Sequence, residues 1–196
     1  NTNVLFGGED DWLDFGDGTR MLIPEQENIP RTDLGEGIAT ASFTVTHTYS
    51  GNAKYIVSYS EPNRNAGVVN MDGSVNTRFY IETQLLIDPF LGCNNTPKLL
   101  VPPMDRACTG VAWFHNPGAY DPDGDSLSYE MVIPFRDINT TVVNYQEPDA
   151  PKFYSDFGHG NEAGTGQPSF SINPVDGTLT WDAPGSIGEY NIAFVV

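Results

Sequence analysis

A short acidic segment in the second half of the chain carries three carboxylates at alternate positions, Asp121, Asp123 and Asp125. Hard oxygen ligands at this spacing can wrap a Ca²⁺ ion at about 2.3–2.6 Å. The segment is not an EF-hand loop, because Gly124 comes fourth rather than sixth and Val132 stands in place of the twelfth-position Glu. The alternative is a solvated turn whose Asp side chains cap backbone N–H groups. Further calcium ligands would come from backbone carbonyls, Asn116, Glu130 or Asp182.

A second acidic turn lies near the start of the chain, where Asp14 and Asp17 alternate with Gly16 and Gly18. These two carboxylates could form a second metal site. The interpretation that we favour is a β-turn in which glycine takes a positive φ and aspartate bonds local amides.

The residue types needed for catalysis do not form a known motif. His47, His115 and His159 are scattered, and there is no Gly-x-Ser-x-Gly, His-Glu-x-x-His or P-loop pattern. Carboxylates are numerous enough for a glycosidase-like pair, but surface acids are the simpler interpretation. We therefore expect a protein that is not an enzyme, with His47 as a core histidine whose ring is hydrogen-bonded.

The two cysteines, Cys93 and Cys108, are 15 positions apart with no histidine between them, which argues against zinc. A disulfide is the preferred interpretation, and closing a loop of this length stabilises a fold by about 3 kcal/mol. The alternative is a pair of buried free thiols in a reducing compartment. A disulfide would favour an exported protein.

Alternation of polar and apolar residues dominates the chain, whereas helical periodicity is nearly absent. Because Pro and Gly cluster after a long predicted strand at 88–97, we expect two all-β units, 1–92 and 93–196, each the size of an immunoglobulin-like sandwich. Loop insertions are expected at 24–37 and 147–167. The predicted strands are 42–49, 54–59, 78–87, 127–133, 140–145, 169–172 and 178–181.

Composition limits the partners. The chain of 196 residues has 26 acidic and 9 basic side chains, a net charge of −17. This balance argues against nucleic acid and anionic membrane surfaces, which both require clustered Lys and Arg. No apolar run is long enough to span a bilayer. Residues 190–196 are predicted to form a strand that ends abruptly, so we expect a fragment of a longer chain.

The first unit resembles the PKD-type immunoglobulin-like module. The resemblance rests on the aromatic–Asp-Phe-Gly-Asp-Gly-Thr pattern at 12–19, followed by His-Thr-Tyr at 47–49 and a strand from Tyr55. Residues 24–37 and 61–75 lie outside the match. Some modules of this type bind Ca²⁺ near the glycine-rich turn, so the resemblance adds support for a site at Asp14 and Asp17.

The second unit resembles a cadherin-like module of the dystroglycan type. Its two motifs are 116–129, which contains the acidic turn, and 170–181 around Asp176-Gly177. The tandem, with segments 61–67 and 80–83 and the Cys93–Cys108 loop, is similar to large Bacteroidetes cell-surface proteins. Those are gliding-associated or adhesin-like chains exported by the type IX secretion system, which implies an extracellular repeat protein.

Two functions of different classes follow. The first is a non-catalytic stalk or adhesion segment, stiffened by Ca²⁺, whose partners are neighbouring repeats and a surface polysaccharide or protein. The alternative is a carbohydrate-binding accessory module of a secreted hydrolase. Aromatic residues that could stack on sugars are Trp12, Trp113 and Trp181, which we expect in the core, and the loop 153–157.

Overall fold

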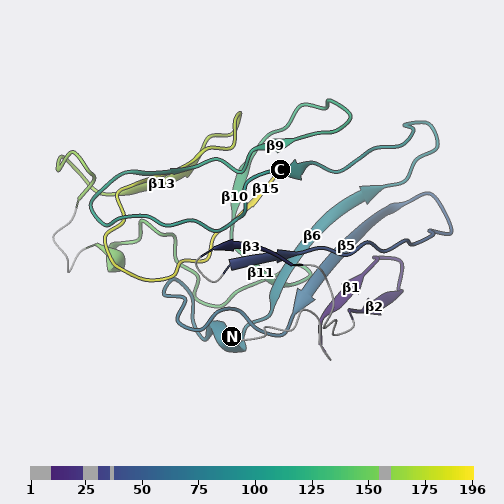
Figure 1. The fold of residues 1–196 in the computed structure, drawn as a ribbon, viewed down its shortest axis with the longest axis horizontal. Helices are drawn as coiled ribbons and strands as arrows, with labels where there is room; N and C mark the ends of the chain where they lie inside the picture. The colour runs from purple at the N-terminus through teal and green to yellow at the C-terminus, as the bar shows by residue number, and fades with distance from the viewer. Residues whose placement is uncertain (1–9, 24–30, 36–37, 155–159) are drawn as a thin grey trace. The chain divides into compact units, whose positions relative to one another are not determined.

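The computed structural model describes residues 10–23, 31–35, 38–154 and 160–196, and in these ranges the chain is all-β, as predicted (Figure 1). Every strand pairing is antiparallel, and the helical turns described are two 3-10 helices, η1 Ser74–Asn76 and η2 Pro151–Phe153. Within the same ranges, no helix has the length and apolar character needed to cross a lipid bilayer.

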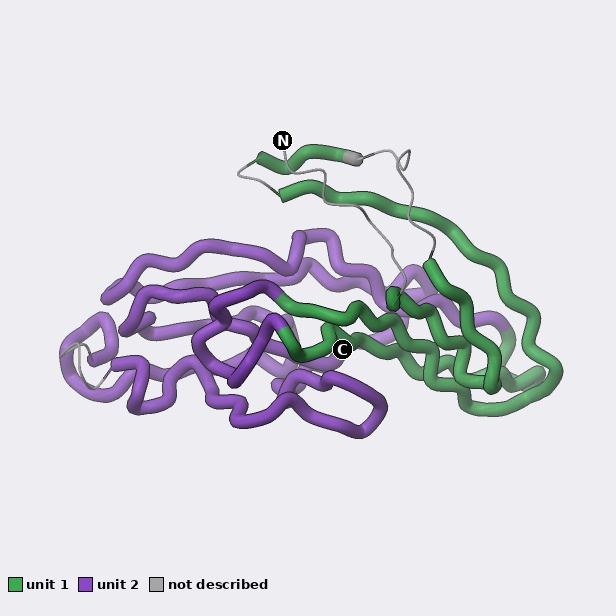
Figure 2. The backbone as a smooth tube through the Cα atoms, turned by 90° about the horizontal axis from the view of Figure 1, so that it is seen from below, with its two compact units in different colours: residues 1–64, 76–92 green, residues 65–75, 93–196 purple. Residues whose placement is uncertain are grey.

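The chain divides into two compact units (Figure 2). Unit 1 comprises Asn1–Arg64 and Asn76–Gly92, and unit 2 comprises Asn65–Val75 and Cys93–Val196. The chain therefore passes between the units after Arg64, after Val75 and after Gly92. Segment Asn65–Val75 interrupts the sequence of unit 1 but belongs to unit 2.

Unit 1 contains a four-stranded sheet in the order β2-β1-β5-β6. The long strands β5 (Lys54–Glu61) and β6 (Phe79–Leu86) pair along their whole length, from Lys54↔Leu86 to Glu61↔Phe79. Their β-branched and aromatic residues favour a pleated, partly covered surface, and Tyr55 and Tyr80 are buried. Strands β1 (Trp12–Asp14) and β2 (Arg20–Leu22) form the hairpin beside β5.

Two expectations for unit 1 are wrong. The loop insertion expected at 24–37 contains strand β3 (Arg31–Gly35), which pairs with β4 (Ile38–Ala41) just after it. Residues 24–30 and 36–37 lie outside the described residues. The strand predicted at 42–49 does not form, although exposure still alternates around His47 and Tyr49. Side chains rather than a backbone ladder hold this stretch, as shown below.

Unit 2 is built from several small antiparallel sheets. The largest has the order β13-β14-β8, with Phe170↔Trp181 and Trp181↔Trp113 in register. Strands 127–133 and 140–145 are shorter than predicted, because only Glu130–Val132 and Thr140–Thr141 pair with another strand. The strands are β7 Lys98–Leu99, β8 Trp113–His115, β9 Ala119–Tyr120, β10 Glu130–Val132, β11 Phe135–Asp137, β12 Thr140–Thr141, β13 Ser169–Ile172, β14 Leu179–Asp182 and β15 Ala193–Val195. The two-stranded pairings are β7–β9, β10–β15 and β11–β12.

Aromatic side chains form the centre of unit 2. Trp181 is 6% exposed and meets Tyr190 edge-on, with ring centroids 4.7 Å apart. Phe170 lies edge-on against Trp181, and Phe153 against Tyr190. The core position predicted for Trp181 is confirmed. Phe153 is 4% exposed, so the expectation that its loop presents an aromatic patch fails at this residue, and 155–157 lie outside the described ranges.

Candidate functional site

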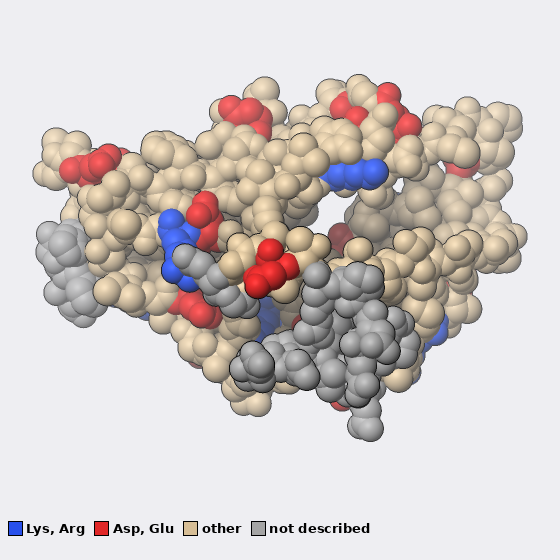
Figure 3. Space-filling model, viewed as in Figure 1, with Lys and Arg blue, Asp and Glu red and all other residues tan. Residues whose placement is uncertain are grey.

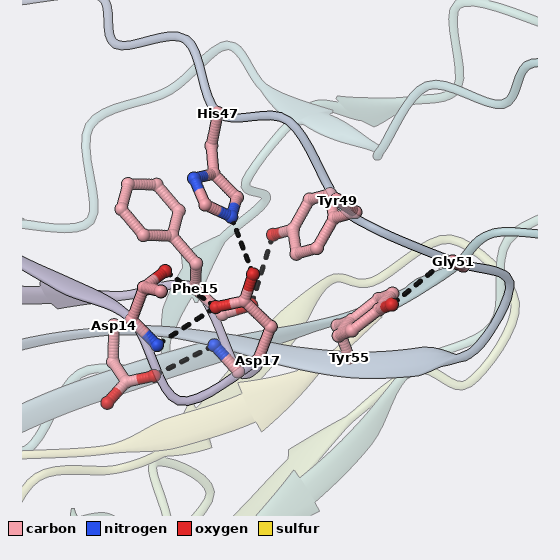
Figure 4. A network of polar contacts seen from close by, with 9 residues as sticks. Asp14, Phe15, Asp17, His47, Tyr49, Gly51 and Tyr55 are labelled. Atoms are coloured by element: carbon pink, nitrogen blue, oxygen red, sulfur yellow. Dashed lines mark hydrogen bonds and ion pairs between the residues drawn. The ribbon is translucent and has the colours of Figure 1, made fainter.

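The glycine-rich turn that follows β1 is organised by its own aspartates (Figure 4). Asp14 Oδ1 accepts a hydrogen bond from the Gly16 N–H at 2.8 Å. Asp17 Oδ1 accepts from the backbone N–H of Thr19 at 3.0 Å and from its hydroxyl at 2.6 Å. Gly16 and Gly18 take φ values of 78° and 88°, a region that other residues rarely adopt. These contacts are those of the β-turn that we favoured.

His47 packs against this turn. Its Nε2 lies 2.8 Å from Asp17 Oδ2, and its ring stacks on Phe15 with centroids 4.0 Å apart and planes inclined by 13°. Tyr49 meets the other side of His47 edge-on and donates a hydrogen bond from its hydroxyl to the Phe15 carbonyl at 3.1 Å. Figure 4 shows that Phe15, His47 and Tyr49 approach one another from two separate chain segments. The predicted hydrogen bond of the His47 ring is confirmed, but the predicted core position is wrong, because the side chain is 21% exposed.

The contacts of Asp17 stabilise its ionised form. The Thr19 hydroxyl, His47 and the Thr19 N–H together lower the pKa of Asp17 to about 2. A carboxylate that orients a histidine is also part of hydrolytic triads, but there the second ring nitrogen faces a hydroxyl or thiol. Among the described residues, no such nucleophile is hydrogen-bonded to His47. The pair therefore ties the stretch around His47 to the turn.

The acidic turn of unit 2 is held in a similar way. Asp121 Oδ1 accepts hydrogen bonds from the N–H groups of Asp123 at 2.7 Å and Asp125 at 3.3 Å. Asp123 accepts from Asn95, at 2.5 Å from the backbone N–H and at 3.0 and 3.1 Å from the side-chain amide. The Asn95 backbone and side-chain N–H groups lower the pKa of Asp123. Through Asn95, this turn thus holds the loop of residues 93–97 in place.

The fit of these residues to calcium is poor in this arrangement. In the described ranges, no three His, Cys, Asp or Glu side chains gather closely enough to hold a metal ion. Asp121 and Asp123 accept from N–H donors, and so do the additional ligands expected from Asn116 and Asp182, whose Oδ1 atoms accept from the N–H groups of Gly118 and Glu162. Binding at Asp121, Asp123 and Asp125, or at Asp14 and Asp17, would compete with the contacts that both oxygens of Asp123 and of Asp17 already make. Calcium stays a prediction.

The cysteines are not joined in the structure. Cys93 and Cys108 are both exposed, with free thiols. Cys93 begins the loop that Asn95 attaches to Asp123. The disulfide between Cys93 and Cys108 remains a prediction, and the test is chemical.

A group of acids in unit 1 was not apparent from the sequence. Asp11 is 8% exposed, and burial, together with the nearby charges of Glu61 and Asp10, raises its pKa. The Tyr59 hydroxyl donates a hydrogen bond to Glu61, and burial raises the pKa of Tyr59. Only the pairing of β1 with β5, which sets Trp12 opposite Ser60, brings Asp11 towards Glu61. A local pattern in the sequence could not reveal this proximity.

A second histidine–carboxylate pair occurs in unit 2. His115 Nδ1 lies 3.1 Å from Asp105 Oδ2, and the Trp113 ring stacks beside His115 with centroids 5.7 Å apart. Burial acts to raise the pKa of Asp105, but the Arg106 N–H and His115 outweigh it, so the pKa is lowered. The pair attaches loop residue Asp105 to β8.

No family model, curated protein or solved structure matches this chain.

Charge is dispersed over the surface. On the face shown in Figure 3, Asp and Glu form several separate groups among other residues, and Lys and Arg are few. The whole chain has 26 acidic and 9 basic residues.

Proposed function

We propose that this chain is a non-catalytic segment of a large secreted cell-surface protein, with two immunoglobulin-like β-sandwiches in tandem that serve as an extracellular stalk or adhesion module. The all-β fold and the two compact units are compatible with this organisation. The resemblance of both units to adhesin-type repeats favours export by the type IX secretion system. Its partners would be neighbouring repeats and a surface polysaccharide or protein.

The observation that carries the proposal is that the polar side chains in the turn after β1 form hydrogen bonds within unit 1. Hydrogen bonds within unit 1 engage the side chains of Asp14, Asp17 and His47. The Asp17–His47 pair joins residues 30 positions apart. Such cross-links make a segment resist extension, which a stalk requires and a catalytic site does not. The Asp105–His115 pair has the same character in unit 2.

Single-molecule pulling of the chain between two anchored ends tests this role. The Asp17–His47 link has to break before the chain around His47 can leave the turn. We expect unit 1 to unfold at a lower force in His47→Ala than in the wild type. Thr48→Ala, an exposed neighbour, is the matched control and should leave the force unchanged. Equal unfolding forces for wild type and His47→Ala would contradict a mechanical role for this link.

A glycan array on the same protein separates the two classes of function. A stalk gives no signal on polysaccharides outside its own cell surface. Strong binding to a plant or animal polysaccharide, retained in His47→Ala, would replace the proposal with the carbohydrate-binding accessory module.

A further inference from the structure

Segment Asn65–Val75 leaves unit 1 and completes unit 2. Its ends are held together, because the Ser74 hydroxyl donates a hydrogen bond to the Asn65 carbonyl at 2.7 Å. Compact loops with closed necks of this kind are Ω-loops, which usually lie on the surface. Here Asn70, Met71 and Ser74 are 0%, 5% and 5% exposed. The segment therefore contributes buried residues to unit 2 at its centre, although its flanking residues are exposed.

The segment runs between two stretches of unit 2 and bonds to both. On one side, the Gln146 N–H donates to the Asn70 carbonyl at 2.9 Å and the Asp72 N–H to the Val143 carbonyl at 3.4 Å. On the other side, the Val69 N–H donates to the Glu189 carbonyl at 2.9 Å. A parallel bridge between Val68 and Glu189 extends this second contact. Main-chain bonds of this kind hold extended peptides that are added to a fold.

The side chain of Asn70 is hydrogen-bonded to both stretches. Its amide nitrogen donates to the carbonyls of Gln146 and Asn191 at 3.1 and 2.8 Å. Its amide oxygen accepts from the Asn191 N–H at 2.8 Å. An amide is the side chain that presents two donors and an acceptor in this geometry, whereas Asp would turn an oxygen towards the two carbonyls.

Packing beside Asn70 is equally specific. A Cβ atom at Gly188 would lie 2.7 and 2.9 Å from the two methyl groups of Val69. Gly188 therefore leaves room for the Val69 side chain, and a larger residue there would force that side chain to shift.

From these contacts we propose that residues 93–196 form an acceptor site for an extended peptide with a central asparagine. The 65–75 segment fills this site within the chain, and the partner that fits it in trans is the same segment of a second copy of this chain. The interaction is noncovalent and depends on Asn70 for its specificity. It is independent of the adhesion role proposed above.

The experiment keeps the full chain and opens it at two exposed points. Specific protease sites are inserted after Asn65 and after Asn76, both exposed, and folding is first verified on the uncut protein. Cleavage then frees peptide 66–76. We expect it to stay bound through gel filtration and to exchange with a fluorescent copy of the same peptide.

Peptide variants supply the specificity control. An Asn70→Asp peptide should bind at least about 10-fold more weakly, because the carbonyls of Gln146 and Asn191 lose their donor and face a carboxylate oxygen instead. An Ala66→Ser peptide, changed at an exposed position, should bind like the wild type. Loss of the freed peptide with unit 2 still folded would overturn the proposal, as would equal affinity of the Asn70→Asp peptide.

The uncut chain provides a second measurement if the inserted sites prevent folding. Asn70→Asp should lower the urea midpoint of unit 2 strongly, whereas Asn52→Asp, at an exposed turn, should not. Similar midpoints for these two variants would also overturn the proposal.

Discussion

Gly16 and Gly18 allow a matched test of how closely the turn after β1 is fitted to the sheet. Both have positive φ, +78° and +88°, so Ala at either position costs about 1–2 kcal/mol in backbone strain. They differ in the space available for a Cβ atom. A Cβ at Gly16 would lie 2.5 Å from the Ile56 carbonyl oxygen and 2.7 Å from its nitrogen, whereas nothing lies within 4 Å of a Cβ at Gly18.

The clash at Gly16 involves the backbone of β5, which cannot turn aside as a side chain can. Overpacking of this kind costs about 1–3 kcal/mol in addition to the strain. We therefore expect Gly16→Ala to reduce the free energy of unfolding of unit 1 by about 2–5 kcal/mol, and Gly18→Ala by about 1–2 kcal/mol. The difference between the variants isolates the contact with Ile56.

Incorporation of 5-fluorotryptophan allows each unit to be followed separately. Trp12 reports on unit 1, while Trp113 and Trp181 report on unit 2, so urea titration by fluorine NMR gives a midpoint for each. Gly16→Ala should lower the Trp12 midpoint well below that of Gly18→Ala. Equal midpoints for the two variants would refute the reasoning, because they would show that strain alone determines the cost.

Three further predictions concern charge, metal and thiols. Because the folded pKa of Asp17 is lowered to about 2, its contribution to stability is complete above its unfolded pKa near 3.8 and is lost as the pH falls through about 2; melting followed at Trp12 from pH 5 to 2 should show this loss in wild type and not in Asp17→Asn. If Ca²⁺ binds the acidic turn at millimolar concentration, it should raise the melting temperature of wild type by a few degrees relative to EDTA and leave Asp123→Ala unchanged; equal shifts in the two proteins would remove the site. Labelling of the denatured, unreduced protein should find no free thiol if Cys93 and Cys108 are joined, and two reactive thiols would refute the disulfide.

The sequence predicted the all-β class and several strands well, because alternation over a long stretch has few alternatives. Residues 54–59 and 169–172 show this clearly, since both lie in strands. Residues 42–49 alternate equally well but form no strand, because His47 and Tyr49 bind the turn through their side chains instead. Periodicity reports which side chains are covered and does not show whether a backbone partner is present.

The sites were harder to predict than the strands. The local bonds of Asp14 and Asp17 were expected from the turn chemistry of Asp-Gly sequences. The contact of Asp123 with Asn95 spans 28 positions, and those of Asn70 with Asn191 span 121. Contacts at such separations depend on the tertiary fold, and one sequence without its structure carries no signal for them.

The interleaving of the units has a consequence for how such a chain can be copied in a gene. A duplication that copied codons 93–196 alone would encode a unit without Asn70 and the contacts that it makes with Gln146 and Asn191. Starting the copy at codon 65 would restore them but would add residues 76–92 without the rest of unit 1. Unit 2 therefore cannot be duplicated as one continuous stretch without part of unit 1, and the smallest block that repeats cleanly contains both units.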